Sequence, residues 1–254
     1  MSHLLNLQRL TKYIGTTTKT MLFSDVEAQA DQGERIAVIG ASGQGKSTLL
    51  RILSLLDRPD EGEMEWKGVS YRRCDPRLWR MKITYVAQHP VMLPGSVEDN
   101  LRMVHSLHKS PYDKALAQRL LQSSGLSTLD IQKRASDLSG GEKQRVALIR
   151  SMMLRPEALL LDEVTASLDP TNAGLVEQLL REWNDQEGTT LIWVTHDLEQ
   201  ARSFSSTTWY MDSHTLLERQ PTELFFSRPD TEAARRFITK SMDSDKEKPC
   251  LSSL

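Results

Sequence analysis

The chain has 254 residues, of which 39% are hydrophobic, and this is enough to form one large α/β domain with a smaller insertion. It contains no apolar run of about 18 residues and no secretion-signal pattern over residues 1–9, so we expect neither a membrane span nor a leader peptide. The net charge of −2 gives no electrostatic reason to expect a nucleic-acid partner. Cys74 and Cys250 lie far apart without partner histidines, which argues against a disulfide framework or a zinc site.

The first part of the chain predicts strands followed by a helix. Residues 1–40 are expected to be rich in β-structure, because residues 21–28 alternate apolar and polar side chains as a half-buried strand does. The apolar run 35–39 predicts a buried strand, and residues 48–56 have the composition of a helix. Between them, residues 40–47 match the complete pattern G-x-x-x-x-G-K-[ST]. This order of strand, glycine loop and helix favours a phosphate-binding loop over a simple glycine turn.

The glycine loop predicts a site for a nucleoside triphosphate. Its glycines let successive backbone N–H groups converge on anionic oxygens at a helix N-terminus, where the helix dipole favours negative charge. Lys46 is expected to reach the β- and γ-phosphates, and the Ser47 hydroxyl to ligate the accompanying Mg²⁺. The residues expected to bind the nucleotide here are Gly40, Ala41, Ser42, Gly43, Gln44, Gly45, Lys46, Ser47 and Thr48.

The next segment changes from strand to helix. Residues 83–88 predict a strand that ends in the amide of Gln88. Residues 89–100 alternate apolar and turn-forming types, which indicates an exposed docking surface, although Met92 and Leu93 could equally be core residues. Between residues 94 and 137 the sequence has a helical character, which is clearest over residues 113–122.

A second helix start with the features of an anion site lies at residues 138–154. Ser139 occupies the expected N-cap position, and Gly140 and Gly141 leave room for an anion to approach the backbone amides. By itself this pattern could be only a capping turn. If it binds phosphate, two helix ends of one domain cannot easily hold the same triphosphate. The simplest geometry therefore places the nucleotide between two copies of the chain.

Two further buried-looking strands deliver polar side chains at their ends. Residues 158–163 end in Asp162, expected to hold Mg²⁺ through water, and Glu163, expected to take a proton from the attacking water. The alternative is that both carboxylates simply end a strand in solvent. Residues 191–197 predict a buried strand that has His196 at its end. A single histidine is more often structural, and the other five histidines of the chain have no comparable context.

In kind and in order, these motifs resemble those of the ATP-binding cassette (ABC) family. Residues 138–142, with the sequence Leu-Ser-Gly-Gly-Glu, are similar to its LSGGQ signature, with Glu142 in place of the common Gln. The resemblance implies that Gln88 is the Q-loop glutamine, whose carbonyl completes Mg²⁺ coordination when the site closes. It implies that residues 167–169, including Asp169, form the D-loop at a dimer interface, and that His196 hydrogen-bonds the γ-phosphate.

The resemblance covers about residues 4–240 and implies an ATPase with one α/β domain. Its expected parts are a RecA-like P-loop core, an N-terminal antiparallel β subdomain, and an inserted helical subdomain at about residues 94–137 plus the following signature helix. Tyr13 is expected to stack on adenine, although it could equally be a packed strand residue. Residues 241–254 are polar and patternless, which predicts a disordered tail.

The same resemblance implies partners and a location. Two copies of the chain are expected to form a homodimer around two ATP molecules with Mg²⁺. A separate multi-span membrane permease is the expected second partner. The chain is therefore expected in the cytoplasm, at the inner face of the cell membrane.

The cargo is harder to predict, because the membrane subunits of such systems select it. Residues 148–151, 159–169 and 191–197 are similar to ATPase subunits of a bacterial group assigned to iron export, which favours metal export. Residues 221–229 are instead similar to the C-terminal segment of phosphate and polar amino-acid importers. A soluble single-cassette ATPase of the iron–sulfur assembly type also fits the chain length. Cassettes linked to DNA or translation do not fit, since neither heptads nor a second phosphate loop is present.

Overall fold

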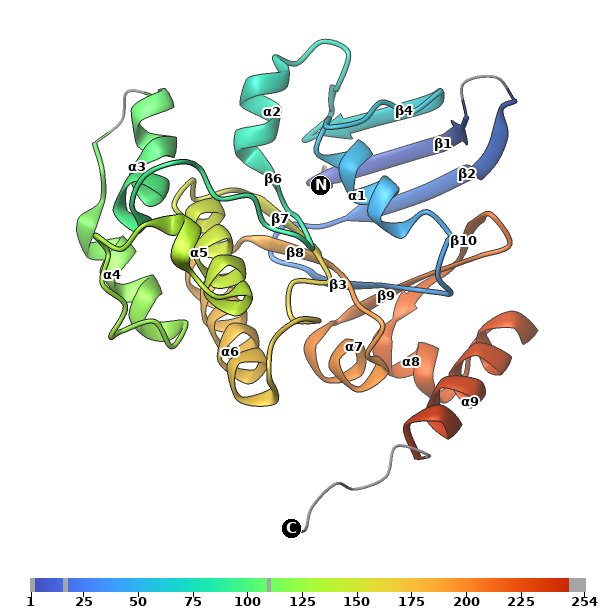
Figure 1. The fold of residues 1–254 in the computed structure, drawn as a ribbon. Helices are drawn as coiled ribbons and strands as arrows, with labels where there is room; N and C mark the ends of the chain where they lie inside the picture. The colour runs from blue at the N-terminus through green and yellow to red at the C-terminus, as the bar shows by residue number, and fades with distance from the viewer. Residues whose placement is uncertain (1–2, 16–17, 109–110, 247–254) are drawn as a thin grey trace.

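Two β-sheets and the helices around them make up the fold in the computed structural model, which describes residues 3–15, 18–108 and 111–246 (Figure 1). One sheet has the strand order β2-β1-β4-β5 and the other the order β10-β9-β3-β8-β7-β6. The smaller sheet consists of β1 Leu5–Ile14, β2 Thr20–Ala30, β4 Glu61–Trp66 and β5 Val69–Ser70. The larger sheet consists of β3 Arg35–Ile39, β6 Ile83–Val86, β7 Ala158–Asp162, β8 Thr190–Val194, β9 Thr207–Asp212 and β10 Thr215–Pro221.

The larger sheet is parallel apart from β10, and β3 lies between β8 and β9. Every residue of β7 and β8 is buried, because helices or the second sheet cover both faces. Alternate residues of β7 contribute to different cores. Leu159 and Leu161 belong to one core, and Ala158 and Leu160 belong to the other. Burial on both faces explains why these strands read as continuous apolar runs.

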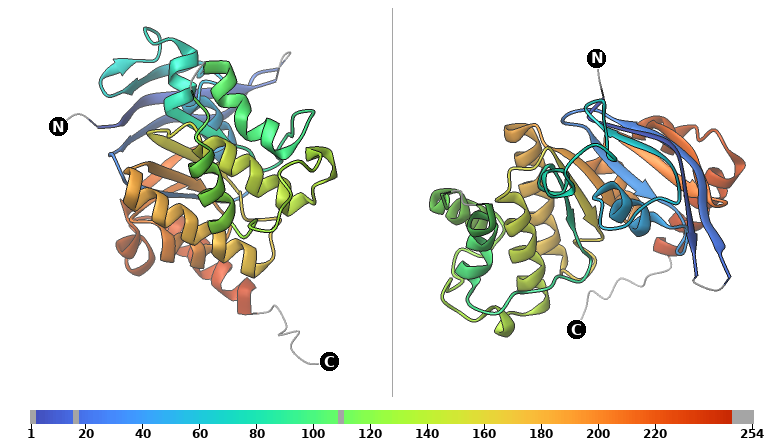
Figure 2. Two further views of the ribbon diagram at one scale, coloured as in Figure 1. Left: turned by 90° about the vertical axis from the view of Figure 1, so that its left-hand side faces the viewer. Right: turned by 90° about the horizontal axis from the view of Figure 1, so that it is seen from above.

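Helices cover the two faces unequally (Figures 1 and 2). On one face lie α3 Val97–His108, α4 Lys114–Ser123, α5 Gly140–Met152 and α6 Pro170–Glu187. On the other face, α1 Lys46–Leu53 packs between the larger sheet and the antiparallel sheet, and α2 Pro76–Lys82 adds Trp79 to the same core. A third core joins β9 to α7 Leu198–Phe204, α8 Thr222–Ser227 and α9 Glu232–Lys246. No helix of the described residues is long and apolar enough to cross a bilayer.

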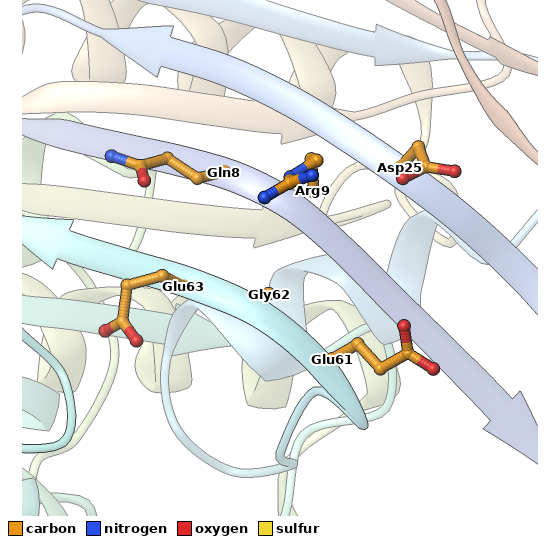
Figure 3. Close-up of a pocket in the computed structure, with 6 residues that line it drawn as sticks. All are labelled: Gln8, Arg9, Asp25, Glu61, Gly62 and Glu63. Atoms are coloured by element: carbon orange, nitrogen blue, oxygen red, sulfur yellow. The ribbon is translucent and has the colours of Figure 1, made fainter.

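The antiparallel sheet bends at a bulge that crosses three strands. Arg9 on β1 and Asp25 on β2 both have φ of 50°, and Gly62 on β4 has φ of 92°. A Cβ at residue 62 would lie 2.4 Å from the Arg9 carbonyl oxygen, so only glycine fits there. The bend leaves a hollow of about 450 Å³, which Figure 3 shows with carboxylates of Asp25, Glu61 and Glu63 around it.

The structure confirms one predicted helix and corrects the predicted start of the tail. The helix predicted over residues 113–122 is α4, and the Asp113 side chain caps it by accepting from the Leu116 N–H. The predicted start of a disordered tail at residue 241 is wrong, because α9 continues to Lys246. Its last residues are polar but compatible with a helix, and Pro249 is the first proline or glycine after the start of α9. The rest of the predicted tail, residues 247–254, lies outside the described residues.

Candidate nucleotide-binding site

The glycine loop lies between β3 and α1, and at two of its positions nothing larger than glycine fits. Gly40 has φ of 147°, and a Cβ there would lie 2.1 Å from the Met211 carbonyl oxygen. Gly45 has φ of 90°, and its Cβ would lie 2.8 Å from Cδ1 of Phe23. Among the described residues, no side chain caps the N-terminus of α1. Its first backbone N–H groups are therefore available to an anion at the loop.

Lys46 is the first residue of α1, and its ammonium group is enclosed by the glycine loop. Its Nζ donates to the carbonyl oxygens of Gly40 and Ala41, at 2.8 Å in each case, and the residue is only 5% exposed. Burial lowers the pKa of the Lys46 ammonium, and the charges of Glu163 and Asp162 oppose this effect. A buried ammonium held by neutral carbonyls gains most from an anionic ligand.

Asp162, at the end of β7, faces two hydroxyl groups. Its Oδ1 accepts from Ser47 Oγ at 2.9 Å and its Oδ2 from the Tyr85 hydroxyl at 2.7 Å. The carboxylate is 3% exposed and forms no ion pair among the residues that the structure describes. A buried carboxylate beside a serine hydroxyl supplies the oxygen ligands that Mg²⁺ prefers, so these residues fit the metal expected from the sequence.

Glu163 follows β7 in a left-handed conformation, with φ of 49°. This turn directs its carboxylate to two side chains that the sequence also predicts as site residues. Oε2 accepts from Gln88 Nε2 at 2.8 Å, and Oε1 lies 2.5 Å from His196 Nε2. A non-glycine residue with positive φ costs conformational energy and is often found where function requires it.

A cavity of about 220 Å³ opens over the glycine loop. It is lined by Leu22, Ser42, Gly43, Gly45, Lys46, Ser47, Thr48, Glu163 and His196. The structure thus brings the loop, the carboxylate after β7 and the histidine after β8 to one place. Gln88 and Asp162 are joined to this group by their hydrogen bonds to Glu163 and Ser47.

The signature residues lie at the N-terminus of α5 and do not line this cavity. Ser139 and Glu142 form a capping box. Glu142 N donates to Ser139 Oγ at 3.2 Å, and Ser139 N donates to a Glu142 carboxylate oxygen at 2.7 Å. That second bond lowers the pKa of the Glu142 carboxyl, and Lys133 Nζ lies 3.7 Å away. Ser139 and Gly140 are exposed and Gly141 is partly so, which leaves this helix end open to a ligand from outside the chain.

Three other predicted site residues lie beyond the cavity lining. Asp169 is the N-cap of α6, and its carboxylate accepts from Asn172 N at 3.0 Å. Tyr13 lies on β1 opposite Met21, with its ring partly exposed and its N–H bonded to Asp60. The side-chain oxygen of Gln44 accepts from the His214 N–H at 3.3 Å.

The sequence did not identify Tyr85 and Gln200 as part of the site. Gln200 bonds Thr195, Thr165 and Glu177, and so connects the segments that carry His196 and Asp169. Tyr85 lies three residues before Gln88 on the strand already predicted to lead to the site. The alternation of side chains along that strand places Tyr85 on the same face as Ile83, and this was the available signal.

The fold and the site together define an ATP-binding cassette, and the comparisons with known proteins agree. The sequence profile described as "ABC transporter" matches residues 23–166, which is more than half of the chain. The chain belongs to the ABC transporter family, and it is an ATPase subunit of that family.

Its relatives within the family carry different names at similar distances. YjkB of Bacillus subtilis (strain 168), named as an ABC transporter ATP-binding protein, is 38% identical over 85% of this chain and 86% of its own. PstB 2 of Natronomonas pharaonis, named for phosphate import, is 36% identical over 86% of this chain and 81% of its own. FetA of Escherichia coli (strain K12), named for iron export, is 33% identical over 78% of this chain and 87% of its own.

A solved structure supports the fold in three dimensions. The ATP-binding cassette MJ0796, whose dimeric structure was solved in a post-hydrolysis state with ADP and Pi, superimposes with a TM-score of 0.76. The match covers 86% of this chain and 98% of MJ0796, at 25% sequence identity. The predicted fold class is therefore confirmed, including the antiparallel β subdomain.

Proposed function

We propose that two copies of the chain bind two ATP molecules head to tail and that hydrolysis drives a separate membrane permease. The observation that carries this proposal is the incomplete site on one chain. The lining of the cavity over the glycine loop includes Lys46, Ser47, Glu163 and His196. The open signature end of α5 is not part of this lining. A second copy can place its Ser139, Gly140 and Gly141 against the phosphates of the first.

Within such a site, each side chain has a role that follows from its present contacts. The Lys46 ammonium exchanges the loop carbonyls for the β- and γ-phosphate oxygens. Glu163, released from Gln88 and His196, accepts a proton from the water whose oxygen bonds to the γ-phosphorus while the bond to the β-phosphate oxygen breaks. His196 then donates to the γ-phosphate. Hydrolysis removes the group that holds the two chains together, and their separation is the mechanical output.

Mg²⁺ is part of this proposal, with Ser47 and Asp162 as the side chains that would hold it. The Gln88 amide uses its nitrogen for Glu163, which leaves its carbonyl oxygen for the metal. Bound there, the ion would neutralise charge that develops on the phosphates. Tyr13 is the proposed adenine-stacking ring, and it lies one strand away from Leu22 at the rim of the cavity.

The surface proposed for the permease lies between α2 and the helical subdomain. A cavity of about 530 Å³ there is lined by Met81 of α2, by residues of α3 and α4, and by Met153 and Leu154 after α5. In residues 89–100, Val91 is 73% exposed, whereas Met92 packs against the core. The segment expected to dock a partner thus offers one exposed apolar side chain in addition to the cavity, which suits a short helix of a membrane protein. We therefore propose that the chain works at the cytoplasmic face of the cell membrane.

For the cargo we propose a metal ion moved outward, and the similarity to FetA supports this choice. The similarity to PstB 2, together with residues 221–229, favours phosphate or polar amino-acid import as the second candidate. An assembly ATPase with a soluble partner is the third candidate. The identity of the partner separates these three functions.

The test is to trap the chain with its partner. The variant Glu163→Gln is expressed in its own cells, supplied with ATP, and recovered from detergent-solubilised membranes for mass spectrometry, with Lys46→Ala as the matched control that should not be trapped. A stoichiometric multi-span protein that is recovered with Glu163→Gln, and not with Lys46→Ala, is expected. Recovery of soluble partners alone would contradict the transporter function.

A further inference from the structure

Asp162 holds its two carboxylate oxygens in different environments, and only one of them faces the glycine loop. Oδ1 accepts from Ser47 Oγ, which belongs to the loop-to-helix junction. Oδ2 accepts from the hydroxyl of Tyr85, which comes from the neighbouring strand β6. Each oxygen has one hydroxyl donor, and the carboxylate is almost completely buried.

The pairing of β6 and β7 explains why the tyrosine reaches this carboxylate. Tyr85 is the register partner of Leu160, and Leu160 and Asp162 are two residues apart on β7. All three side chains therefore point to the same face of the sheet, which is the face that α1 covers. The Tyr85 ring packs against the core formed there, together with Leu160, Leu50 and Leu53. This packing fixes the ring, so its hydroxyl is held at one position.

We propose that Tyr85 is a positioning residue for Asp162 in metal binding, an inference that rests on the proposed Mg²⁺ role of Asp162 and Ser47. When the Ser47 hydroxyl turns to the ion, the Tyr85 hydroxyl still holds Oδ2 and prevents rotation of the carboxylate. Oδ1 then remains directed at the loop. A tyrosine suits this task better than a lysine or arginine, because a neutral donor leaves the full negative charge of the carboxylate for the cation.

The experiment compares nucleotide binding with and without the metal. Calorimetric titration with AMP-PNP gives one Kd in Mg²⁺ and another in EDTA, and the ratio of the two measures the contribution of the metal. The variant Tyr85→Phe removes only the hydroxyl. We expect an unchanged Kd in EDTA and a Kd in Mg²⁺ that is about tenfold weaker, the usual effect of removing a group that orients a metal ligand.

The matched control is Tyr210→Phe. The Tyr210 hydroxyl also donates to a carboxylate, that of Asp212 at 3.2 Å, but its ring belongs to the third core with Phe225. This control should leave the ratio unchanged. An unchanged ratio in Tyr85→Phe would overturn the proposal. An equal weakening of both Kd values would also overturn it, because that result indicates general damage to the site.

A double-mutant cycle separates this inference from the function on which it rests. Asp162→Asn alone should bring the ratio of the two Kd values close to one, because the metal then contributes little to binding. Adding Tyr85→Phe to this variant should change the ratio no further. If Asp162→Asn keeps the wild-type ratio, the proposed role of Asp162 fails. If Asp162→Asn brings the ratio close to one while Tyr85→Phe keeps the wild-type ratio, only the role of Tyr85 fails.

Discussion

Replacing Gln200 by methionine should destabilise the region around His196 substantially, although the two side chains have nearly the same shape. Gln200 is 8% exposed and makes three side-chain hydrogen bonds. Its Nε2 donates to Thr165 Oγ1 at 3.0 Å and to Glu177 Oε1 at 2.7 Å, and its Oε1 accepts from Thr195 Oγ1 at 2.7 Å. The thioether of methionine can replace none of these bonds at comparable strength.

The cost can be estimated from the burial of the groups left behind. Thr195 is 6% exposed, so the loss of the acceptor for its hydroxyl hydrogen would cost the most, although its oxygen still accepts from the Asp197 N–H. Thr165 and Glu177 are partly exposed and can turn to water. The three losses together amount to about 3 kcal/mol of unfolding free energy. For a chain of this length, that loss corresponds to a fall in Tm of about 6–12 °C.

Urea unfolding and calorimetry of the ligand-free chain would measure this effect. The control is Gln178→Met on the exposed face of α6, where the amide makes one bond to Glu182 and should contribute within about 0.5 kcal/mol. If Gln200→Met unfolds at the same urea concentration as Gln178→Met, the network contributes no net stability and this reasoning is refuted.

Three further changes test other parts of the structure. Gly40→Ala should greatly weaken ATP binding, because its Cβ would lie 2.1 Å from a carbonyl oxygen of β9. Gly174→Ala, in open space on α6, should instead stabilise the fold by about 1 kcal/mol; ATP titration and thermal melts would reveal an error in either expectation. Burial raises the pKa of the Glu157 carboxyl, but hydrogen bonds from Lys67 and Trp66 outweigh it, so the net pKa is lowered. The stability from this carboxylate is present above its usual pKa and is lost as the pH falls through its lowered value. Glu157→Gln should therefore show a smaller loss of urea midpoint between about pH 6 and pH 3, and a loss equal to that of the wild type would contradict this assignment.

The sequence was most informative where short motifs lie at the ends of buried strands. Strands β3, β7 and β8 read as apolar runs because both of their faces are covered, and the residues after them are those proposed for the chemistry of the site. Lys46, Glu163 and His196 were predicted in this way, and the structure places all three around one cavity.

Features that depend on pairing between distant segments could not be predicted. Tyr85 meets Asp162 across 77 positions of sequence, and only the register of β6 with β7 brings them together. The bulge at Arg9, Asp25 and Gly62 depends in the same way on three strands at once. The helical end of α9 was missed for a different reason. Its polar composition is typical of a disordered tail, but composition alone does not end a helix.

The central claim is that each ATP lies between the glycine loop of one chain and the signature of another, and complementation tests it most directly. Lys46→Ala disables the loop, and Ser139→Phe covers the N-terminus of α5. Each variant alone should hydrolyse almost no ATP. In an equal mixture, half of the dimers are mixed, and each mixed dimer has one intact site.

The mixture should therefore recover up to about a quarter of the wild-type rate if the two sites act independently. Mixing the Lys46→Ala chain with the double variant that carries both changes is the control, because no dimer in that mixture contains an intact site. Recovery of hydrolysis in the first mixture would support a site shared between two chains. The absence of any recovery, with both variants shown to be folded and to dimerise, would contradict it.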